Sequence, residues 1–396
     1  MRGKRPTHPA PRTPHPAYTM TPLVALDLGS TKVACAIGLP HEQAPGFELL
    51  GSGLVNYPAI SDVWFGDPLM VSRTIEQALG ATGVAGEFHR ALVSVNPPSL
   101  RSERAHVAIT LGDEPVPVKA HDLRRLEDRA LAQALGVDRE PLLVERLTCA
   151  GNGFDGVRDP RGLAATRLVA AFHIVTMPIA ARRVTVQAVE SVGLEIARLS
   201  YSLPALLAGA AMDDVQHKRV LLVDVAGLTT SLGAFVEGAL QACELVPGGG
   251  LTMATTVAGQ CHVTLEQALA WTLEGAACRK PEVRALIDAQ RDALGDAIAR
   301  LLEHQPQPDL VLVSGRGALV DGFMEWLEQA TGLAPLLCRS PAHATSLELS
   351  KQVGLSAAIG LLELATRASH ATPRRTPNGL FDRLIDRTRT ILTEYF

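Results

Sequence analysis

The chain has 396 residues, of which 47% are apolar, and a formal net charge of -4. This size and composition provide a large core and predict two or more subdomains, while the acidic balance argues against a nucleic-acid-binding protein. No stretch reaches 18 apolar residues, which argues against a membrane-spanning helix. The six cysteines lack metal-like spacing, as expected of buried thiols in a reducing cytoplasm. Residues 1–20 are rich in Pro, His and Arg, so we expect a disordered extension, with Met20 as a candidate start.

The first informative segment is an apolar run over 23–28, followed by a polar turn and a second apolar run over 33–37. This pattern predicts a β-hairpin with Asp27 buried near the end of its first strand. A buried carboxylate is costly unless a cation, a water network or a phosphate-bound metal stabilises it. The turn supplies small residues, hydroxyls and an ammonium group, which suit a phosphate, although an ordinary surface hairpin has a similar sequence. The turn residues are Gly29, Ser30, Thr31 and Lys32.

A second copy of this pattern lies at 221–235, where Asp224 is flanked by valines and Gly227 and Thr229 follow in the turn. Asp27 and Asp224 lie 197 residues apart, about half of the chain, which indicates an internal duplication with two related lobes. We therefore expect both turns to face one cleft, in which the two carboxylates flank a polyphosphate and its metal.

The segment between the two hairpins predicts further elements. Apolar patterning favours a helix over 68–79 and a strand over 91–95. An inserted α+β module then interrupts the first lobe up to about residue 176, with strands at 107–111, 142–147 and 167–175, a helix at 122–135 and a loop at 151–162. A helix over 180–192 ends at Gly193, where we expect a left-handed conformation, and 194–199 returns to the sheet as a strand.

Beyond the second hairpin, Gly249 and Gly250 precede a helix over 252–257, where backbone N–H groups could approach an anion or simply form a flexible turn. Further helices are predicted at 265–273, 282–302 and 353–365. A strand over 309–313, a turn containing Gly315 and Gly317, and a helix over 318–330 suit a ribose or phosphate, although a generic βα turn looks the same.

The C-terminal segment is a basic linker over 371–378 followed by an amphipathic helix over 379–396. The helix could dock on the protein itself or on a partner helix, but its arginines and terminal aromatic residues favour an anionic membrane surface. Burial of the apolar face nearly cancels the cost of ordering the helix, so we expect weak binding by one copy and tight binding by an assembly. The apolar face consists of Leu380, Phe381, Leu384, Ile385, Ile391, Leu392, Tyr395 and Phe396.

Taken together, these segments resemble the FtsA family of bacterial cell-division proteins, which are actin-superfamily members. The resemblance lies in LDLGSTKVACAIG, VDVAG, PRGLAATRLVAAFHIVT, AVESVGLEI, VLVSGRGALVDGF and LSAAIGLL, together with the C-terminal helix. It implies a two-lobed α/β fold of the actin/ribonuclease-H-like type with an inserted FtsA-type subdomain. The implied divisions are a first lobe over 21–88, 177–203 and 354–370, the insert over 89–176, subdomain 2A over 204–247 and 307–353, and a shortened subdomain 2B over 248–306.

The resemblance also implies ATP and Mg2+ as cofactors. Asp27 and Asp224 would hold Mg2+ through water, with Gly29, Ser30, Thr31 and Lys32 at the phosphates from one side and Gly227 and Thr229 from the other. Gly249 and Gly250 would lie near phosphate and ribose, and Gly315 and Gly317 under the adenine. The implied protein is a peripheral membrane protein on the cytoplasmic face at the division site. It would form head-to-tail filaments and bind the FtsZ C-terminal tail, anionic lipids and other divisome proteins, with no nucleic acid.

Several positions depart from the family pattern: Ala226, Leu228, Ser231, Thr256, Trp271 and Arg316. These departures predict weak nucleotide binding and at most a slow Mg-dependent ATPase activity. We assign no catalytic residue from the sequence. The alternatives are a PilM-like scaffold of pilus assembly, an FtsA-like protein that no longer hydrolyses ATP, and a sugar-kinase-type enzyme. The last would need a catalytic carboxylate facing an acceptor, which the sequence does not identify.

Overall fold

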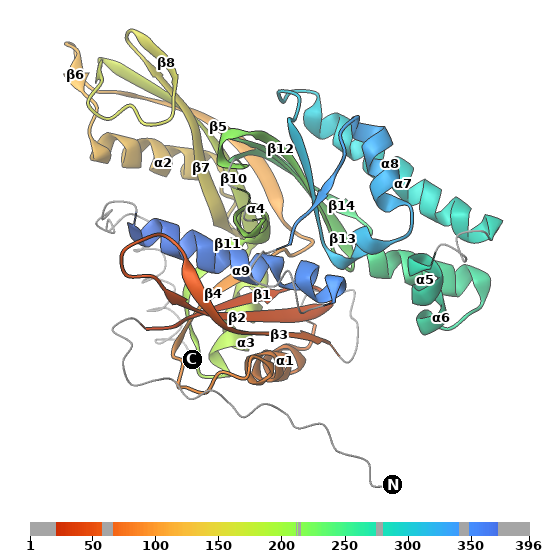
Figure 1. Cartoon of the computed structure of the whole chain (residues 1–396). Coiled ribbons are helices and arrows are strands. Elements are labelled where there is room, and N and C mark those ends of the chain that lie inside the picture. The colour runs from red at the N-terminus through yellow and green to blue at the C-terminus, as the bar shows by residue number, and fades with distance from the viewer. Residues whose placement is uncertain are drawn as a thin grey trace.

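The computed structural model describes residues 21–57, 66–210, 212, 215–274, 280–339 and 348–370. These residues form two lobes, each built on a five-stranded sheet, and an inserted subdomain that extends from the first lobe (Figure 1). The predicted extension, the linker over 371–378 and the amphipathic helix over 379–396 lie outside the described residues. Within the part of the chain that is described, no helix is both long and apolar enough to cross a membrane.

The first lobe contains a sheet in the order β11-β4-β1-β2-β3, with β1 at its centre. Helices α1 and α3 cover one face, and α9 crosses the other, packed also against α4 (Figure 1). Because both faces are covered, β1 is apolar throughout except for Asp27. The elements are β1 (Leu23–Leu28), β2 (Lys32–Pro40), β3 (Phe47–Asn56), α1 (Pro68–Ala81), β4 (Arg90–Val95), α3 (Ile179–Glu190), β11 (Glu195–Tyr201), α4 (Ser202–Gly209) and α9 (Leu349–His370).

The second lobe repeats this order as β14-β13-β12-β15-β16, which corresponds to β3-β2-β1-β4-β11 of the first lobe. The internal duplication predicted from the two hairpins is therefore confirmed. The elements are η1 (Val215–His217), β12 (Arg219–Val225), β13 (Thr229–Val236), β14 (Ala239–Pro247), α5 (Gly250–Cys261), α6 (Leu265–Leu273), α7 (Pro281–Leu302), β15 (Leu310–Ser314), η2 (Arg316–Leu319), α8 (Phe323–Thr331) and β16 (Leu336–Leu337).

The inserted subdomain is a four-stranded sheet in the order β5-β10-β7-β8, with α2 packed against it and a small β6–β9 sheet at its tip (Figure 1). It has a core of its own, centred on Leu126, Leu168 and Phe172. Its elements are β5 (Arg101–Thr110), β6 (Val116–Pro117), α2 (Ala120–Ala134), β7 (Arg139–Gly151), β8 (Phe154–Val157), β9 (Ala164–Ala165) and β10 (Arg167–Pro178).

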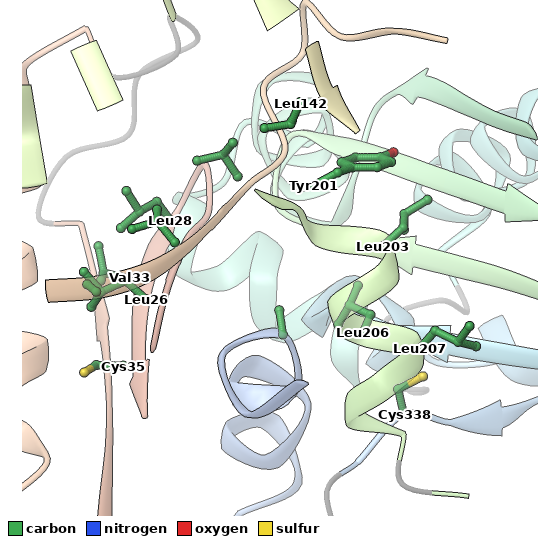
Figure 2. Close-up of a cluster of buried hydrophobic side chains, with 14 of the residues drawn as sticks. Leu26, Leu28, Val33, Cys35, Leu142, Tyr201, Leu203, Leu206, Leu207 and Cys338 are labelled. Atoms are coloured by element: carbon green, nitrogen blue, oxygen red, sulfur yellow. The ribbon is translucent and has the colours of Figure 1, made fainter. Parts of the chain in front are cut away.

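The largest core runs from the first sheet to the second through α4 (Figure 2). Leu203, Leu206 and Leu207 of α4 lie in this core with Tyr201, which precedes the helix. The helices α4 and α9 cross so closely that a Cβ atom at Gly360 would lie 1.7 Å from the carbonyl oxygen of Ala205. This crossing anchors the C-terminal helix of the first lobe beneath the cleft.

Most predicted elements are present, and the differences are local. The predicted helix over 318–330 is present only from Phe323 onwards, as α8, because Gly322 has φ 69° and separates the short η2 turn from α8. The predicted loop over 151–162 contains strand β8, which pairs with β7. Gly193 has φ 78°, so the predicted left-handed end of α3 is confirmed. In the described residues of 248–306, the second lobe carries helices α5, α6 and α7 and no strand.

Candidate functional site

A cavity of about 440 Å3 lies between the two lobes, and both hairpin turns line it. Its volume is in the range of small-molecule sites. Eleven of the twelve predicted binding residues line this cavity: Asp27, Gly29, Ser30, Thr31, Lys32, Asp224, Gly227, Thr229, Gly250, Gly315 and Gly317. The twelfth, Gly249, is not among the lining residues. It packs against the second turn, where a Cβ atom would be 2.4 Å from the carbonyl oxygen of Ala226.

Asp27 is buried at the end of β1, with 7% of the residue exposed. Its carboxylate has two partners in the first lobe. Lys32 Nζ lies 2.6 Å from Oδ2, and the Ser94 hydroxyl donates a hydrogen bond of 2.7 Å to Oδ1. Of the stabilising groups that the sequence left open for this acid, the described residues supply a cation, Lys32, five residues away on the same hairpin.

Asp224 occupies the matching position at the end of β12 in the second lobe. Burial, and then the negative charge of Asp27, raise its pKa to about 7, against the opposing effects of Lys32 and of a hydrogen bond from Ser314. Asp27 and Asp224 line the same cavity, so negative charges on the two carboxylates oppose each other there.

The two lobes support their acids in the same way. Ser94 is the register partner of Asp27 on the parallel strand β4, and Ser314 is the register partner of Asp224 on β15. Sequence reasoning missed both serines. A signal was present, because each serine lies at or near the C-terminal end of an apolar strand, but only the strand pairing connects it to an acid.

The glycines near the second acid allow backbone segments to approach one another. Gly315 has φ 81°, and a Cβ atom there would lie 2.2 Å from the carbonyl oxygen of Val225. The Gly250 amide donates to the Ala226 carbonyl at 2.9 Å, which joins the start of α5 to the hairpin turn. These contacts bring three separate segments of the second lobe to one edge of the cavity.

The remaining wall combines apolar residues with a few polar groups. Arg316 also lines the cavity, and burial lowers the pKa of its guanidinium. The Tyr57 hydroxyl and the Asn96 Oδ1 atom are buried and have no hydrogen-bond partner among the described residues. Both residues line the cavity, and neither was predicted from the sequence. The apolar lining residues include Leu206, Leu251, Leu269, Leu273, Leu319 and Val353.

The acid pair fits a divalent cation. Mg2+ prefers a few carboxylates completed by phosphate oxygens and water. A cation between Asp27 and Asp224 would stabilise the ionised Asp224 carboxylate, whose pKa is raised by burial and then by the charge of Asp27. Lys32 and the hydroxyls of the first turn supply further groups for an anion. The cavity can therefore hold a phosphorylated ligand at the acids, with its organic part against the apolar wall.

Comparison with known proteins gives matches to the insert and to much of the chain. The family model described as the SHS2 domain inserted in FtsA matches residues 98–176, the segment from before β5 to near the end of β10. The cell division protein FtsA of Pseudomonas aeruginosa is 28% identical over 231 residues, covering 58% of this chain and 54% of that protein. FtsA of Rhizobium meliloti is 27% identical over 266 residues, covering 64% of this chain and 60% of that protein. The chain therefore matches little more than half of the length of these relatives.

Among solved structures, a chain of the PilM–PilN type IV pilus biogenesis complex is similar with a TM-score of 0.66 at 14% identity, covering 87% of this chain and 98% of that one. This similarity bears on the fold alone. The fold is that of the actin-like ATPases, mixed α/β with an inserted SHS2 subdomain.

Proposed function

Because the chain belongs to the FtsA family, we propose that it is an actin-like, nucleotide-binding adaptor that polymerises and ties the FtsZ division ring to the cytoplasmic membrane. Its ligands would be ATP and Mg2+. Its partners would be the FtsZ C-terminal tail, further copies of itself, anionic lipids and other divisome proteins. It would act at the division site on the cytoplasmic face of the membrane. Any hydrolysis would be slow.

The observation that carries the proposal is the position of Asp27 and Asp224 on opposite walls of one cavity. Ser30, Thr31 and Lys32 from one turn and Gly227 and Thr229 from the other would contact the phosphates. Asp27 and Asp224 would hold Mg2+ through water, and the ion would neutralise phosphate charge when bound. The nucleoside would lie against the apolar wall near Gly315 and Gly317. Gly249 and Gly250 would support the second turn and the start of α5.

The membrane part of the proposal depends on the sequence of 379–396. Its apolar face and its arginines suit an anionic lipid surface, and the linker over 371–378 gives it reach from α9. A single helix of this kind binds weakly, whereas a filament that presents many copies binds by avidity. Self-association and membrane attachment are therefore parts of one proposal.

Nucleotide binding can be tested by titrating Mg-ATP into the full chain in a calorimeter, beside Asp27→Ala. We expect saturable binding that falls at least tenfold in the variant, because the acid nearest to Lys32 is lost. Asp309→Ala is a matched control, since its carboxylate is paired with Arg219 at the surface and does not line the cavity. Equal affinity in Asp27→Ala and the parent chain would rule out this site.

Membrane attachment can be tested by co-sedimentation with vesicles of phosphatidylglycerol and phosphatidylethanolamine. The full chain should pellet, a chain lacking 379–396 should remain in the supernatant, and neutral phosphatidylcholine vesicles should recover little of either. Unchanged co-sedimentation of the shortened chain would exclude the helix as the anchor. Filaments that form equally well with and without nucleotide would favour an FtsA-like protein with a degenerate site.

A further inference from the structure

The cavity between the lobes has a polar and an apolar part. The two hairpin turns supply the polar part, with both acids and Lys32. Helix α6, the η2 turn and helix α9 supply the apolar part, and these three elements are joined. The η2 turn contacts α9, and the Asp321 N–H group that follows η2 donates to the Thr272 carbonyl of α6 at 3.2 Å. The apolar side chains of this part are Leu269, Leu273, Leu319 and Val353.

Arg316 introduces a positive charge into the apolar part. It is the first residue of η2, it lines the cavity, and it is half-buried. Its guanidinium has no hydrogen bond or ion pair with any residue in the described parts of the chain. A partly desolvated cation without an acceptor is unfavourable, so this position suits a ligand that supplies acceptors.

The two acids already have another cation. Asp27 is paired with Lys32 at 2.6 Å, and the positive charge that lowers the pKa of Asp224 is also that of Lys32. Burial alone perturbs the pKa of Arg316, so no described carboxylate offsets its charge. Arg316 is therefore available to a part of the ligand other than the group held at the acids.

The backbone around Arg316 is held on both sides. The Ala318 N–H group donates to the Gly315 carbonyl at 3.1 Å, which closes the turn. On the other side, a Cβ atom at Gly317 would lie 2.9 Å from the Gly250 nitrogen at the start of α5. Because the turn is fixed between β12 and α5, the position of the guanidinium depends on its own side-chain torsions, and a fixed backbone favours a specific contact.

The chemistry of arginine narrows the acceptor. Its guanidinium only donates, through a planar fork that matches two adjacent acceptors. In the proposed site the phosphates lie at the acids and the nucleoside lies near Gly315 and Gly317, the residues on either side of Arg316. Guanine presents two adjacent acceptors, O6 and N7, whereas adenine presents N7 beside the N6 amino donor, which opposes a second donor.

We propose that Arg316 contacts the base of the bound nucleotide and makes this cavity bind a guanine nucleotide more tightly than an adenine nucleotide. The inference rests on the nucleotide site proposed above and concerns the base alone. ATP is still bound, because the groups at its phosphates are the same, but it leaves one arm of the guanidinium without an acceptor.

Calorimetric titration of the full chain with Mg-GTP and Mg-ATP tests the preference. We expect GTP to bind at least about tenfold more tightly than ATP. Mg-ITP keeps O6 and N7 but lacks the 2-amino group, so its affinity should lie within about threefold of that for GTP. The 7-deaza analogue of GTP lacks the N7 acceptor and should lose most of the preference.

Arg316→Gln tests the residue itself. A glutamine amide pairs with N6 and N7 of adenine, so GTP affinity should fall about tenfold while ATP affinity is kept or increased. Arg300→Gln is the matched control, because Arg300 pairs with Glu244 at the surface and does not line the cavity. This control should retain the parental affinities for both nucleotides.

Four results decide against the inference or the site. Equal affinities in the parent chain, or tighter binding of ATP, would overturn the inference and leave the nucleotide site intact, whether or not Arg316→Gln folds. A GTP preference that persists in Arg316→Gln would overturn it as well. An equal loss of GTP and ATP affinity there would place the guanidinium at ribose or phosphate and also overturn it. Absence of binding by every nucleotide would contradict the proposed function itself.

Discussion

Gly227 lies so close to Thr31 that a Cβ atom at Gly227 would be 2.2 Å from Thr31 Cγ2. The turns of the two hairpins therefore touch across the cleft, each from a different lobe. Because the contact joins turns separated by about half of the chain, the width of the cleft depends on the absence of a side chain at this position. The relationship also explains how two duplicated hairpins form one site.

Gly227→Ala should widen the cleft, since Thr31 must move to admit the new methyl group. We expect the free energy of unfolding to fall by about 1–3 kcal/mol and Mg-ATP affinity to fall at least tenfold. Urea unfolding and calorimetry measure the two effects. Gly259→Ala in α5 is the control, because a Cβ atom there meets no atom within 4 Å, and alanine favours the helix. A Gly227→Ala chain with parental affinity would contradict the contact.

The crossing of α4 and α9 should tolerate an added side chain even less well than the contact at Gly227 does. At Gly360 a Cβ atom would lie 1.7 Å from the Ala205 carbonyl oxygen, which belongs to the backbone of α4 and has no side-chain freedom. Gly360→Ala should therefore lower the free energy of unfolding by about 3 kcal/mol or more, measured by urea unfolding. Gly80→Ala in α1, where the space is open, should leave stability unchanged or slightly raised. Equal midpoints for the two variants would refute the close crossing.

Local sequence pattern was sufficient for the hairpins. The apolar runs of β1 and β12 and their turns are contiguous, so strand, acid and turn could be read together, and their equivalence indicated the duplicated lobes. The break between η2 and α8 could not be predicted from the local pattern, because it depends on Gly322 adopting a left-handed backbone conformation. A helical apolar pattern continues through that glycine.

The residues that support the two acids could not be predicted from the sequence, for a different reason. Ser94 acts on Asp27 only through the parallel pairing of β4 with β1, and Asn96 gains its place through Ser231, which is 135 residues away. Such contacts depend on strand order between distant segments, which a pattern within one segment does not specify. The acids could be predicted, whereas the groups that orient them required the fold.

His173 should make the fold sensitive to acid. It is fully buried in β10, with Nε2 2.8 Å from the Ser102 hydroxyl and Nδ1 3.0 Å from the Leu240 carbonyl oxygen of the second lobe. Burial lowers the pKa of His173 to about 4, so the unfolded chain binds this proton more readily than the folded chain. The contribution of neutral His173 to the free energy of unfolding is complete above pH 6.5 and is lost as the pH falls through 4. The loss is on the order of 3 kcal/mol.

Urea unfolding between pH 4 and pH 8 would measure this effect. His173→Gln should flatten the dependence between pH 6.5 and pH 4, even where the variant is less stable overall. His106→Gln, at an exposed position on the neighbouring strand β5, is the control and should keep the parental slope. A parental slope in His173→Gln would assign the acid sensitivity to other groups.

Asp224 should give stability the opposite pH dependence, because its pKa is raised and that of His173 is lowered. Its pKa is raised to about 7 by burial and by Asp27, so the folded chain retains a proton that the unfolded chain releases near pH 3.8. The stability that this retained proton provides is present below pH 3.8 and lost as the pH rises through 7. Asp224→Asn should therefore stabilise the ligand-free chain at pH 8 by at least about 1 kcal/mol and have little effect at pH 4.

The same substitution should weaken Mg-ATP binding at least tenfold, so gain of stability and loss of affinity would occur together. In the parent chain, affinity should rise between pH 6 and pH 8 as the Asp224 carboxyl loses its proton. Asp309→Asn is the matched control: Arg219 lowers the pKa of Asp309 to about 2, so the substitution should not stabilise the chain at pH 8. An Asp224→Asn chain less stable than its parent at pH 8 would show that the acid supports the fold and is not held under strain for a cation.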